Sequence, residues 1–272
     1  MLTDFKGVNM FRRFLLTVVI LFLFEGCIQP STGVTPSASH SSAKRVGYLV
    51  NVRQYPTHTH VGTTALTNFT KTYPYQWKIP TYIENKLAKN LKETTGAKPI
   101  NLRKEAVSPH ELNGLIKNVN GTWMVAKGKR EVYEKLTKRL NLSAVVIINE
   151  SKKQAIKDCG ILGCTEVDAK GYGVLSRSFI NQNKFFSATA FYATIYKLNP
   201  LESLDKYLKE INESDKMTLV AVSRGSNVDA NKINFVYPKK FNEWTEEELK
   251  PFRIPLIKYI DGMSKKVAES LK

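Results

Sequence analysis

The chain has 272 residues, of which 42% are hydrophobic and 10% aromatic, and it carries a formal net charge of +17. This composition is typical of a folded globular protein with a sizeable core, and it excludes a wholly disordered chain. Apart from one run near the amino terminus, no stretch approaches 18 apolar residues, so no other segment is expected to cross a bilayer as a helix.

That run lies in residues 10–27, MFRRFLLTVVILFLFEGC. Arg12 and Arg13 precede an apolar stretch, 14–24, which only Thr17 interrupts. Eleven helical residues reach about 16 Å, roughly half of a hydrocarbon core, so the stretch is too short for a stable span. Its order of basic, apolar and small residues predicts a secretory signal, residues 1–27.

The end of this signal resembles that of bacterial lipoproteins, in which a cysteine after a small residue is lipidated and becomes the new amino terminus. Cys27 follows Gly26 in this way, although Phe24 and Glu25 depart from the usual pattern. The resemblance implies acyl chains such as palmitate on Cys27 and an anchor on the periplasmic face of the outer membrane. The alternatives are an ordinary cleaved signal and an uncleaved anchor, and Met10 is an alternative start.

Removal of the signal takes away three basic and two acidic residues, so the remaining chain keeps +16. On an exported protein this charge would meet anionic lipid headgroups or peptidoglycan, and nucleic acid is not an expected partner. Because the lysines are scattered, a solvated face is the alternative interpretation. Residues 28–44, rich in Ser, Thr and Pro, predict a disordered tether, and residues 45–272 predict a single mixed α/β domain.

The first half of the domain alternates predicted strands and helices. Strands are expected at 46–52 and 97–102, and the long irregular stretch 53–79 between them is expected to pair in part as an edge strand. Leucine and isoleucine at a spacing of four predict a helix that begins at Pro80. A capping box at Ser108 and Glu111 predicts a second helix with Leu112, Leu115, Ile116 and Val119 on one stripe.

The second half begins with a helix marked by Val132, Leu136 and Leu140, followed by a buried strand, 144–148. A hairpin is expected from strands 172–180 and 185–198 with its turn at 181–184. The remaining expectations are a helix at 201–211, a strand at 219–222, a capping box at Thr245 before a short turn, and a terminal helix from Pro255. This order predicts a mixed β-sheet covered by helices, with a late antiparallel hairpin.

The segments RVGYLVNV, IENKLAKNLKETTG, KPINLR and SAVVIIN, followed by paired strands, give residues 45–198 a recognisable element order. It resembles a group that comprises the amino-terminal domain of the TolB translocation protein, the curli-secretion pore subunit and the penicillin-binding-protein activator lipoproteins. The resemblance implies an envelope lipoprotein that acts by binding or assembly, without a cofactor.

Cys159 and Cys164 close a small loop, CGILGC. In an oxidising compartment this pair predicts a disulfide bond that fixes a local hairpin-like loop. A redox-active pair is the alternative, although the spacing is not that of thiol oxidoreductases.

His58 and His60, two apart in THTH, would point to the same side of a strand and could share a Zn²⁺ ion. A zinc-dependent periplasmic hydrolase built on them is the second functional hypothesis. It needs a third ligand, and structural histidines are the alternative. Ser176, Ser178 and Ser223 lack a nucleophile motif.

Aromatic rings alternate with lysines between positions 69 and 78. Such a stretch predicts a surface that binds a protein or glycan partner, and the alternative is that its rings pack into the core. Its members are Phe69, Lys71, Tyr73, Tyr75, Trp77 and Lys78. The leading hypothesis is a non-catalytic envelope lipoprotein that binds an envelope protein or peptidoglycan. A secretion-pore or assembly subunit is the third.

Overall fold

The computed structural model describes residues 44–272 except 63, 161–162, 180–181 and 223–243. Residues 43–272 form one compact unit. The predicted signal with Cys27, and the predicted tether except for its last residue, Lys44, lie outside the described residues.

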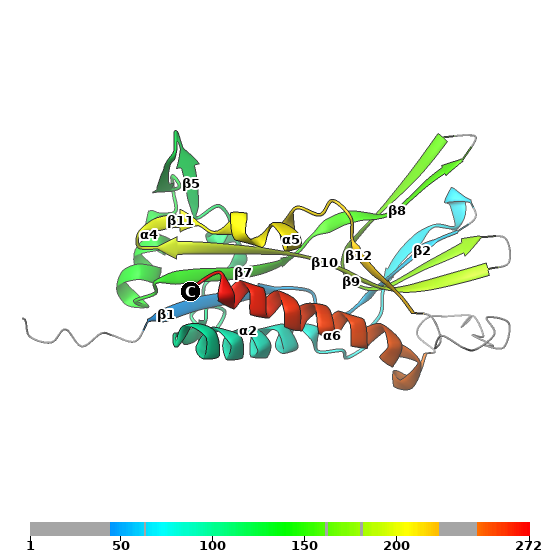
Figure 1. Ribbon diagram of the computed structural model, residues 1–272, viewed down its shortest axis with the longest axis horizontal. Helices are drawn as coiled ribbons and strands as arrows, with labels where there is room; N and C mark the ends of the chain where they lie inside the picture. The colour runs from blue at the N-terminus through cyan, green and yellow to red at the C-terminus, as the bar shows by residue number, and fades with distance from the viewer. Residues whose placement is uncertain (1–43, 63, 161–162, 180–181, 223–243) are drawn as a thin grey trace, which may run out of the picture. The chain divides into compact units, whose positions relative to one another are not determined.

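A ten-stranded mixed sheet forms the centre of this unit (Figure 1). Its main path runs β3-β2-β9-β10-β7-β1-β4, while β11 and β12 pair with β10, and β8 pairs with β9. The strands are β1 (Arg45–Asn51), β2 (Thr57–Val61), β3 (Phe69–Thr72), β4 (Lys98–Asn101), β7 (Ala144–Glu150), β8 (Lys152–Gly160), β9 (Gly163–Phe179), β10 (Gln182–Leu198), β11 (Leu201–Ser203) and β12 (Thr218–Ala221). The predicted fold class, a mixed α/β sheet with a late antiparallel hairpin, is confirmed.

Two strongly apolar strands, β1 and β7, lie inside the sheet and not at its edges. β1 lies between β4 and β7 and is parallel to both, with Val46 opposite Ala144 and Val50 opposite Ile148. β7 pairs on its other side with β10 in the antiparallel sense. Continuous apolar sequence fits these strands because elements cover both of their faces.

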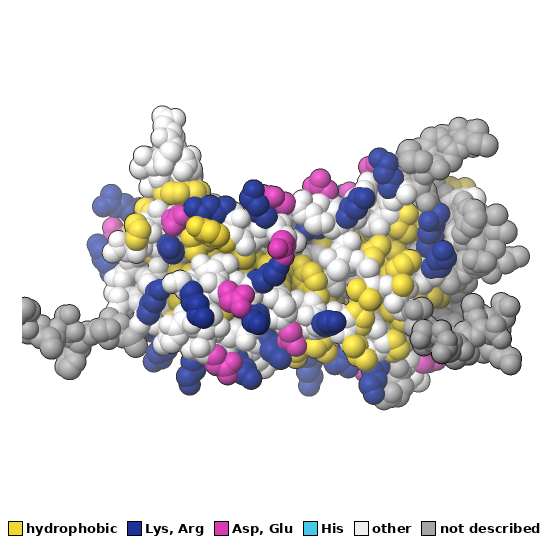
Figure 2. Space-filling view, viewed as in Figure 1, with side chains coloured by type: hydrophobic (Ala, Val, Ile, Leu, Met, Phe, Trp, Pro, Cys, Tyr) yellow, Lys and Arg dark blue, Asp and Glu magenta, His cyan; other side chains and the backbone are white. Residues whose placement is uncertain are grey.

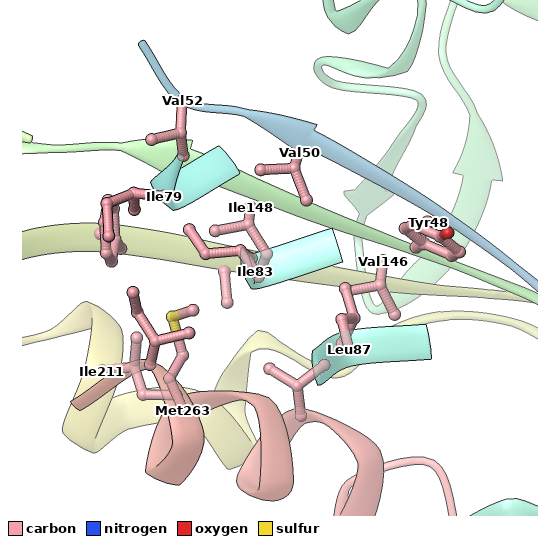
Figure 3. Close-up of a cluster of buried hydrophobic side chains, with 14 of the residues drawn as sticks. Tyr48, Val50, Val52, Ile79, Ile83, Leu87, Val146, Ile148, Ile211 and Met263 are labelled. Atoms are coloured by element: carbon pink, nitrogen blue, oxygen red, sulfur yellow. The ribbon is translucent and has the colours of Figure 1, made fainter. Parts of the chain in front are cut away.

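Helices α2 (Ile79–Thr95) and α6 (Glu246–Glu269) lie together on one face of the sheet (Figure 1). The predicted stripe of Ile83, Leu87 and Leu91 is fully buried, and Gly96 ends α2 in the left-handed conformation. Figure 3 shows Ile83 and Leu87 pointing between the strand residues Val50, Ile148 and Val146 and the helix residue Met263.

On the opposite face, the predicted capping box of Ser108 and Glu111 is present, but its helix, α3 (Pro109–Leu112), has only four residues. The end of the predicted stripe forms strand β5 (Ile116–Val119), which pairs in a hairpin with β6 (Thr122–Val125). The prediction of a long helix is wrong. Gly114, Asn120 and Gly121 all adopt positive φ angles, which interrupt an α-helix. The Asn120-Gly121 pair makes the hairpin turn, for which this dipeptide is especially favourable.

The helix predicted around Leu136 is present as α4 (Arg130–Glu134) and the π-helical turn η2 (Lys135–Arg139). The helix predicted at 201–211 is instead β11, a 3₁₀ turn η3 (Asp205–Leu208) and α5 (Lys209–Asn212). Its first residues join the sheet because β11 pairs with the end of β10. A further 3₁₀ turn, η1 (Ala65–Thr67), joins β2 to β3.

The terminal helix begins earlier than predicted. The capping box of Thr245 and Glu248 opens α6 directly, and the helix continues through Pro251 and Pro255 instead of starting at the second proline. The helix stays on the sheet at these prolines because Phe252 and Leu256 are buried in the core.

The long strands β8, β9 and β10 form two successive hairpins. β9 and β10 extend the predicted hairpin strands, and β8 was not predicted as a strand. Of the predicted turn 181–184, residue 181 lies outside the described residues, and β10 begins at Gln182.

Candidate functional site

The predicted histidine pair lies on β2, which is buried along its whole length between β3 and β9. β2 is antiparallel to β3 and parallel to β9, and His60 is opposite Ser176 in the register with β9. Because alternate residues of a strand share a face, His58 and His60 point to the same side, as predicted.

Both imidazoles converge on one hydroxyl group. Ser176 Oγ lies 2.6 Å from His58 Nε2 and 2.8 Å from His60 Nδ1. A serine hydroxyl has one proton, so Ser176 donates to one ring and accepts an N–H from the other. Ser176 is fully buried, and the two histidines are 4% and 6% exposed. We call these three residues the His–Ser cluster.

Aromatic rings line the His–Ser cluster. Phe69 stacks on His60 with ring centroids 5.0 Å apart and meets His58 edge-on at 5.2 Å. The ring of Tyr73 lies 6.4 Å from that of His58. These apolar neighbours remove water from the imidazoles, which disfavours their charged forms.

Burial lowers the pKa of His58 to about 3, with a smaller contribution from the neighbouring His60. Burial also lowers the pKa of His60. Both rings are therefore neutral at neutral pH, and the cluster is an uncharged hydrogen-bonded network.

The zinc hypothesis requires a third ligand near the two histidines, and the hydrolase hypothesis requires access for a substrate. Within the described residues no group of three His, Cys, Asp or Glu side chains is placed to hold a metal ion. His110 lies exposed on α3, a separate element on the other face of the sheet. A serine between two histidines has the composition of a nucleophile with its base, but the Ser176 hydroxyl has no solvent exposure through which a substrate could reach it.

Ser176 is the member of the cluster that sequence reasoning missed as a partner of the histidines. A weak signal was present, since Tyr172, Val174, Ser176 and Ser178 alternate with other residues and share one face of β9. That β2 would lie beside β9, more than a hundred residues later, could not be inferred from local pattern. Of the other serines considered, Ser178 is half-buried, and Ser223 lies outside the described residues.

The residues of the aromatic-basic stretch, 69–78, differ in how deeply they are buried. Trp77 is only 2% exposed and belongs to the main core, which corrects its assignment to a binding surface. Tyr73 and Tyr75 are half-buried and pack against the same core. Lys71 and Lys78 are exposed, and Lys71 Nζ lies 5.4 Å from the centroid of the half-buried Phe69 ring.

The exposed part of this stretch is an edge of the sheet. β3 is the terminal strand of the sheet path, and Thr70, Lys71 and Thr72 are exposed. Tyr73 donates its N–H to Pro56 across the β2–β3 pair. Because inward and outward amides alternate along such a strand, the main-chain groups of Thr70 and Thr72 point away from β2.

A second polar network holds the junction of β1, β2 and β9. Arg53 Nε and Nη2 donate to both carboxylate oxygens of Glu150 at 2.7–2.9 Å. The Tyr172 hydroxyl donates to the carbonyls of Arg53 and Gln54. This network fixes the chain between β1 and β2, and so positions the histidine strand.

Cys159 and Cys164 are opposite each other in the register of the β8–β9 hairpin. The backbone thus has the hairpin form expected of the cysteine loop. The disulfide bond itself stays a prediction.

Among the helices that the structure describes, none combines the length and the apolarity needed to span a bilayer. No protein-family model matches the chain, and no curated protein matches it. Among solved structures, the hypothetical protein CT253 from Chlamydia trachomatis matches 82% of this chain and 98% of its own, with 13% sequence identity and a TM-score of 0.29. No family membership follows from this similarity.

Proposed function

We propose that this protein is a non-catalytic lipoprotein of the bacterial envelope that binds an extended segment of another envelope protein at the edge strand β3. The single observation that carries the binding role is this edge. Among the described strands, β3 pairs only with β2, and the main-chain donors and acceptors of Thr70 and Thr72 face outward.

An extended peptide can add to such an edge as a further strand, with main-chain hydrogen bonds supplying affinity. The two ends of the sheet path differ in this respect. β4, the strand at the other end, contains Pro99, which has no N–H to donate. β3 contains no proline, so its outward amides at Thr70 and Thr72 are available to a partner.

The charge of the edge indicates the partner's chemistry. Lys71 is exposed in the centre of β3, and Lys78 is exposed just before α2. A partner strand with acidic side chains would complement both, and such complementarity mainly sets the association rate and specificity. The acidic partner is expected to be a protein, and not peptidoglycan, because main-chain pairing with β3 requires an extended polypeptide.

The test uses the full chain in its native membranes. A photo-crosslinking residue at position 72 is expected to join the protein to one partner, and affinity capture after mild solubilisation is expected to recover the same partner. Thr70→Pro removes an outward N–H, and Lys71→Glu reverses the charge. Each is expected to reduce capture at least tenfold, which corresponds to a loss of about 1.4 kcal/mol in binding free energy.

Lys104→Glu is the matched control, since Lys104 is exposed but lies outside β3. This variant is expected to retain the partner, and unfolding transitions of all variants show whether the fold is kept. Equal capture by the wild type and by both β3 variants, or no crosslink from position 72, would contradict binding at this edge.

A further inference from the structure

Four strands meet at the end of the sheet where the chain enters the domain. β1, β4 and β7 are parallel, so they all begin at this end, and the antiparallel β10 finishes there. Lys44 accepts a hydrogen bond from the Lys98 amide, and Arg45 accepts one from Ser143, whose carbonyl accepts the N–H of Leu198. We call this the entry end.

The entry end is basic. The segments 44–46, 97–99, 138–144 and 196–200 contain no Asp or Glu. Their basic residues are Lys44, Arg45, Lys98, Lys138, Arg139 and Lys197. Figure 2 shows basic side chains outnumbering acidic ones at the end of the view where β1 begins.

Part of this charge is neutralised within the domain and part is not. Lys138 pairs with Glu134 at 3.2 Å, and Lys197 pairs with Glu202 at 3.7 Å. Lys44, Lys98 and Arg139 are exposed, and among the residues that the structure describes they make no ion pair with a carboxylate. These three exposed cations belong to the segments that form the entry end, where residue 44 leads out of the domain.

We propose that the entry end docks on the anionic phospholipid headgroups of the membrane that holds the lipid anchor. The 17 residues 28–44 join Cys27 to β1. If this segment forms the predicted tether, a coil of that length would have a root-mean-square span of about 23 Å, and an anchor at Cys27 would keep this end of the domain close to the bilayer. Each Lys or Arg near an anionic surface strengthens binding about fivefold.

This inference goes beyond the proposed function. It depends on the expected anchor for the membrane's proximity, and it uses none of the β3 residues. Docking by the entry end would fix which side of the domain faces the bilayer. It would also leave β3, which lies toward the far ends of β9 and β10, directed away from the membrane (Figure 1).

The test measures binding to vesicles by co-sedimentation. Residues 43–272 form a compact unit with its own cores on both faces of the sheet, so they can be studied without the leader. This unit is expected to bind phosphatidylcholine vesicles that contain about 30% phosphatidylglycerol, and not vesicles of phosphatidylcholine alone. Binding is expected at about 50 mM salt and to be lost at about 500 mM, because salt shortens the Debye length.

The triple variant K44Q/K98Q/R139Q is expected to bind about 100-fold more weakly, from three contributions of about fivefold each. The control K170Q/K184Q/K216Q removes the same charge from exposed positions on β9, on β10 and before β12. Its binding is expected to fall less than about threefold. Thermal unfolding of both variants confirms that each is folded.

Three results would overturn the proposal. Equal losses in the two triple variants would show that total charge, and not the entry end, drives binding. Absence of binding to the anionic vesicles would remove the membrane as the partner. Binding to peptidoglycan sacculi that depends on Lys44, Lys98 and Arg139, without vesicle binding, would assign the surface to an acidic polymer instead. None of these results bears on partner capture at β3.

Discussion

The Ser176 hydroxyl donates to one buried imidazole and accepts an N–H from the other, and this arrangement couples the fold to pH. A buried network of this kind is stable only while all of its members keep the required protonation state. Protonation of His58 would place a charge among Phe69, Tyr73 and His60, where water is excluded. The folded protein therefore resists taking up that proton.

We predict that the protein loses stability as the pH falls below about 6.5, the ordinary pKa of histidine. The folded-state pKa of His58 is about 3, so between these values the unfolded chain binds more protons, and the free energy of unfolding falls with falling pH. His58 alone is expected to lower the free energy of unfolding by about 2 kcal/mol between pH 7.5 and pH 5. Denaturant titrations at the two pH values measure this difference.

The matched variants are His58→Gln and His110→Gln. The first removes the buried titrating group, and its loss of stability on acidification is expected to be smaller than that of the wild type. The second changes an exposed histidine outside the cluster and is expected to leave the loss unchanged. If His58→Gln and the wild type lose the same stability, the cluster is not the source of the pH dependence.

At the scale of elements, β2 and β9 approach more closely than side chains allow. A Cβ atom on Gly173 would lie 1.9 Å from the Thr57 carbonyl oxygen, and Gly173 has a φ angle of 152°. The neighbouring Gly171 has a φ angle of 72°, and a Cβ there would lie 2.7 Å from the Glu150 side chain. Glycine at position 173 lets β2 pair in parallel with β9 and so places His60 opposite Ser176, while glycine at position 171 leaves room for the Glu150 side chain.

We predict that Gly173→Ala destabilises the fold by about 3 kcal/mol or more, because the added methyl group meets backbone that cannot move without breaking the β2–β9 pair. Gly262→Ala in α6 is the control, since nothing lies within 4 Å of its Cβ position. That change is expected to be neutral or to stabilise by up to about 1 kcal/mol. Similar unfolding midpoints for the two variants would show that the close approach is not required.

Local pattern predicted those elements whose determinants are local. The stripe of α2, the buried strand β7 and the capping boxes at Ser108 and Thr245 follow from spacing and from side chains three or four residues apart. The β5–β6 hairpin has a local signal in Asn120-Gly121, which the prediction from the capping box and the apolar spacing did not use. A four-residue helix and a hairpin can present the same apolar residues to the core as a longer helix.

Pairing between strands far apart in the sequence determines the features that local pattern did not predict. The pairing of β2 with β9 brings Ser176 to the histidines, and no short segment encodes that register. Trp77 was assigned to a surface because its neighbours are lysines, yet the turn into α2 directs it into the core. The pairing of β11 with β10 likewise converted the start of a predicted helix into a strand.

At the scale of the whole molecule, the edge strand β3 and the entry end lie in different parts of the sheet. The edge strand β3 belongs to one end of the sheet path, while the entry end gathers the starts of β1, β4 and β7. We propose that the first binds a protein partner and that the second meets the membrane. Both proposals depend on an address in the envelope, which residues 1–27 are predicted to supply.

The intact mass of the protein extracted from its native membrane tests that address most directly. We predict a chain that begins at Cys27 and carries acyl groups, and a small mass increase on reduction that marks the Cys159–Cys164 disulfide. Metabolic labelling with a fatty acid is expected to depend on Cys27 and to disappear in Cys27→Ser. An unmodified chain that retains residues 1–27 and is recovered from the soluble fraction would contradict the account.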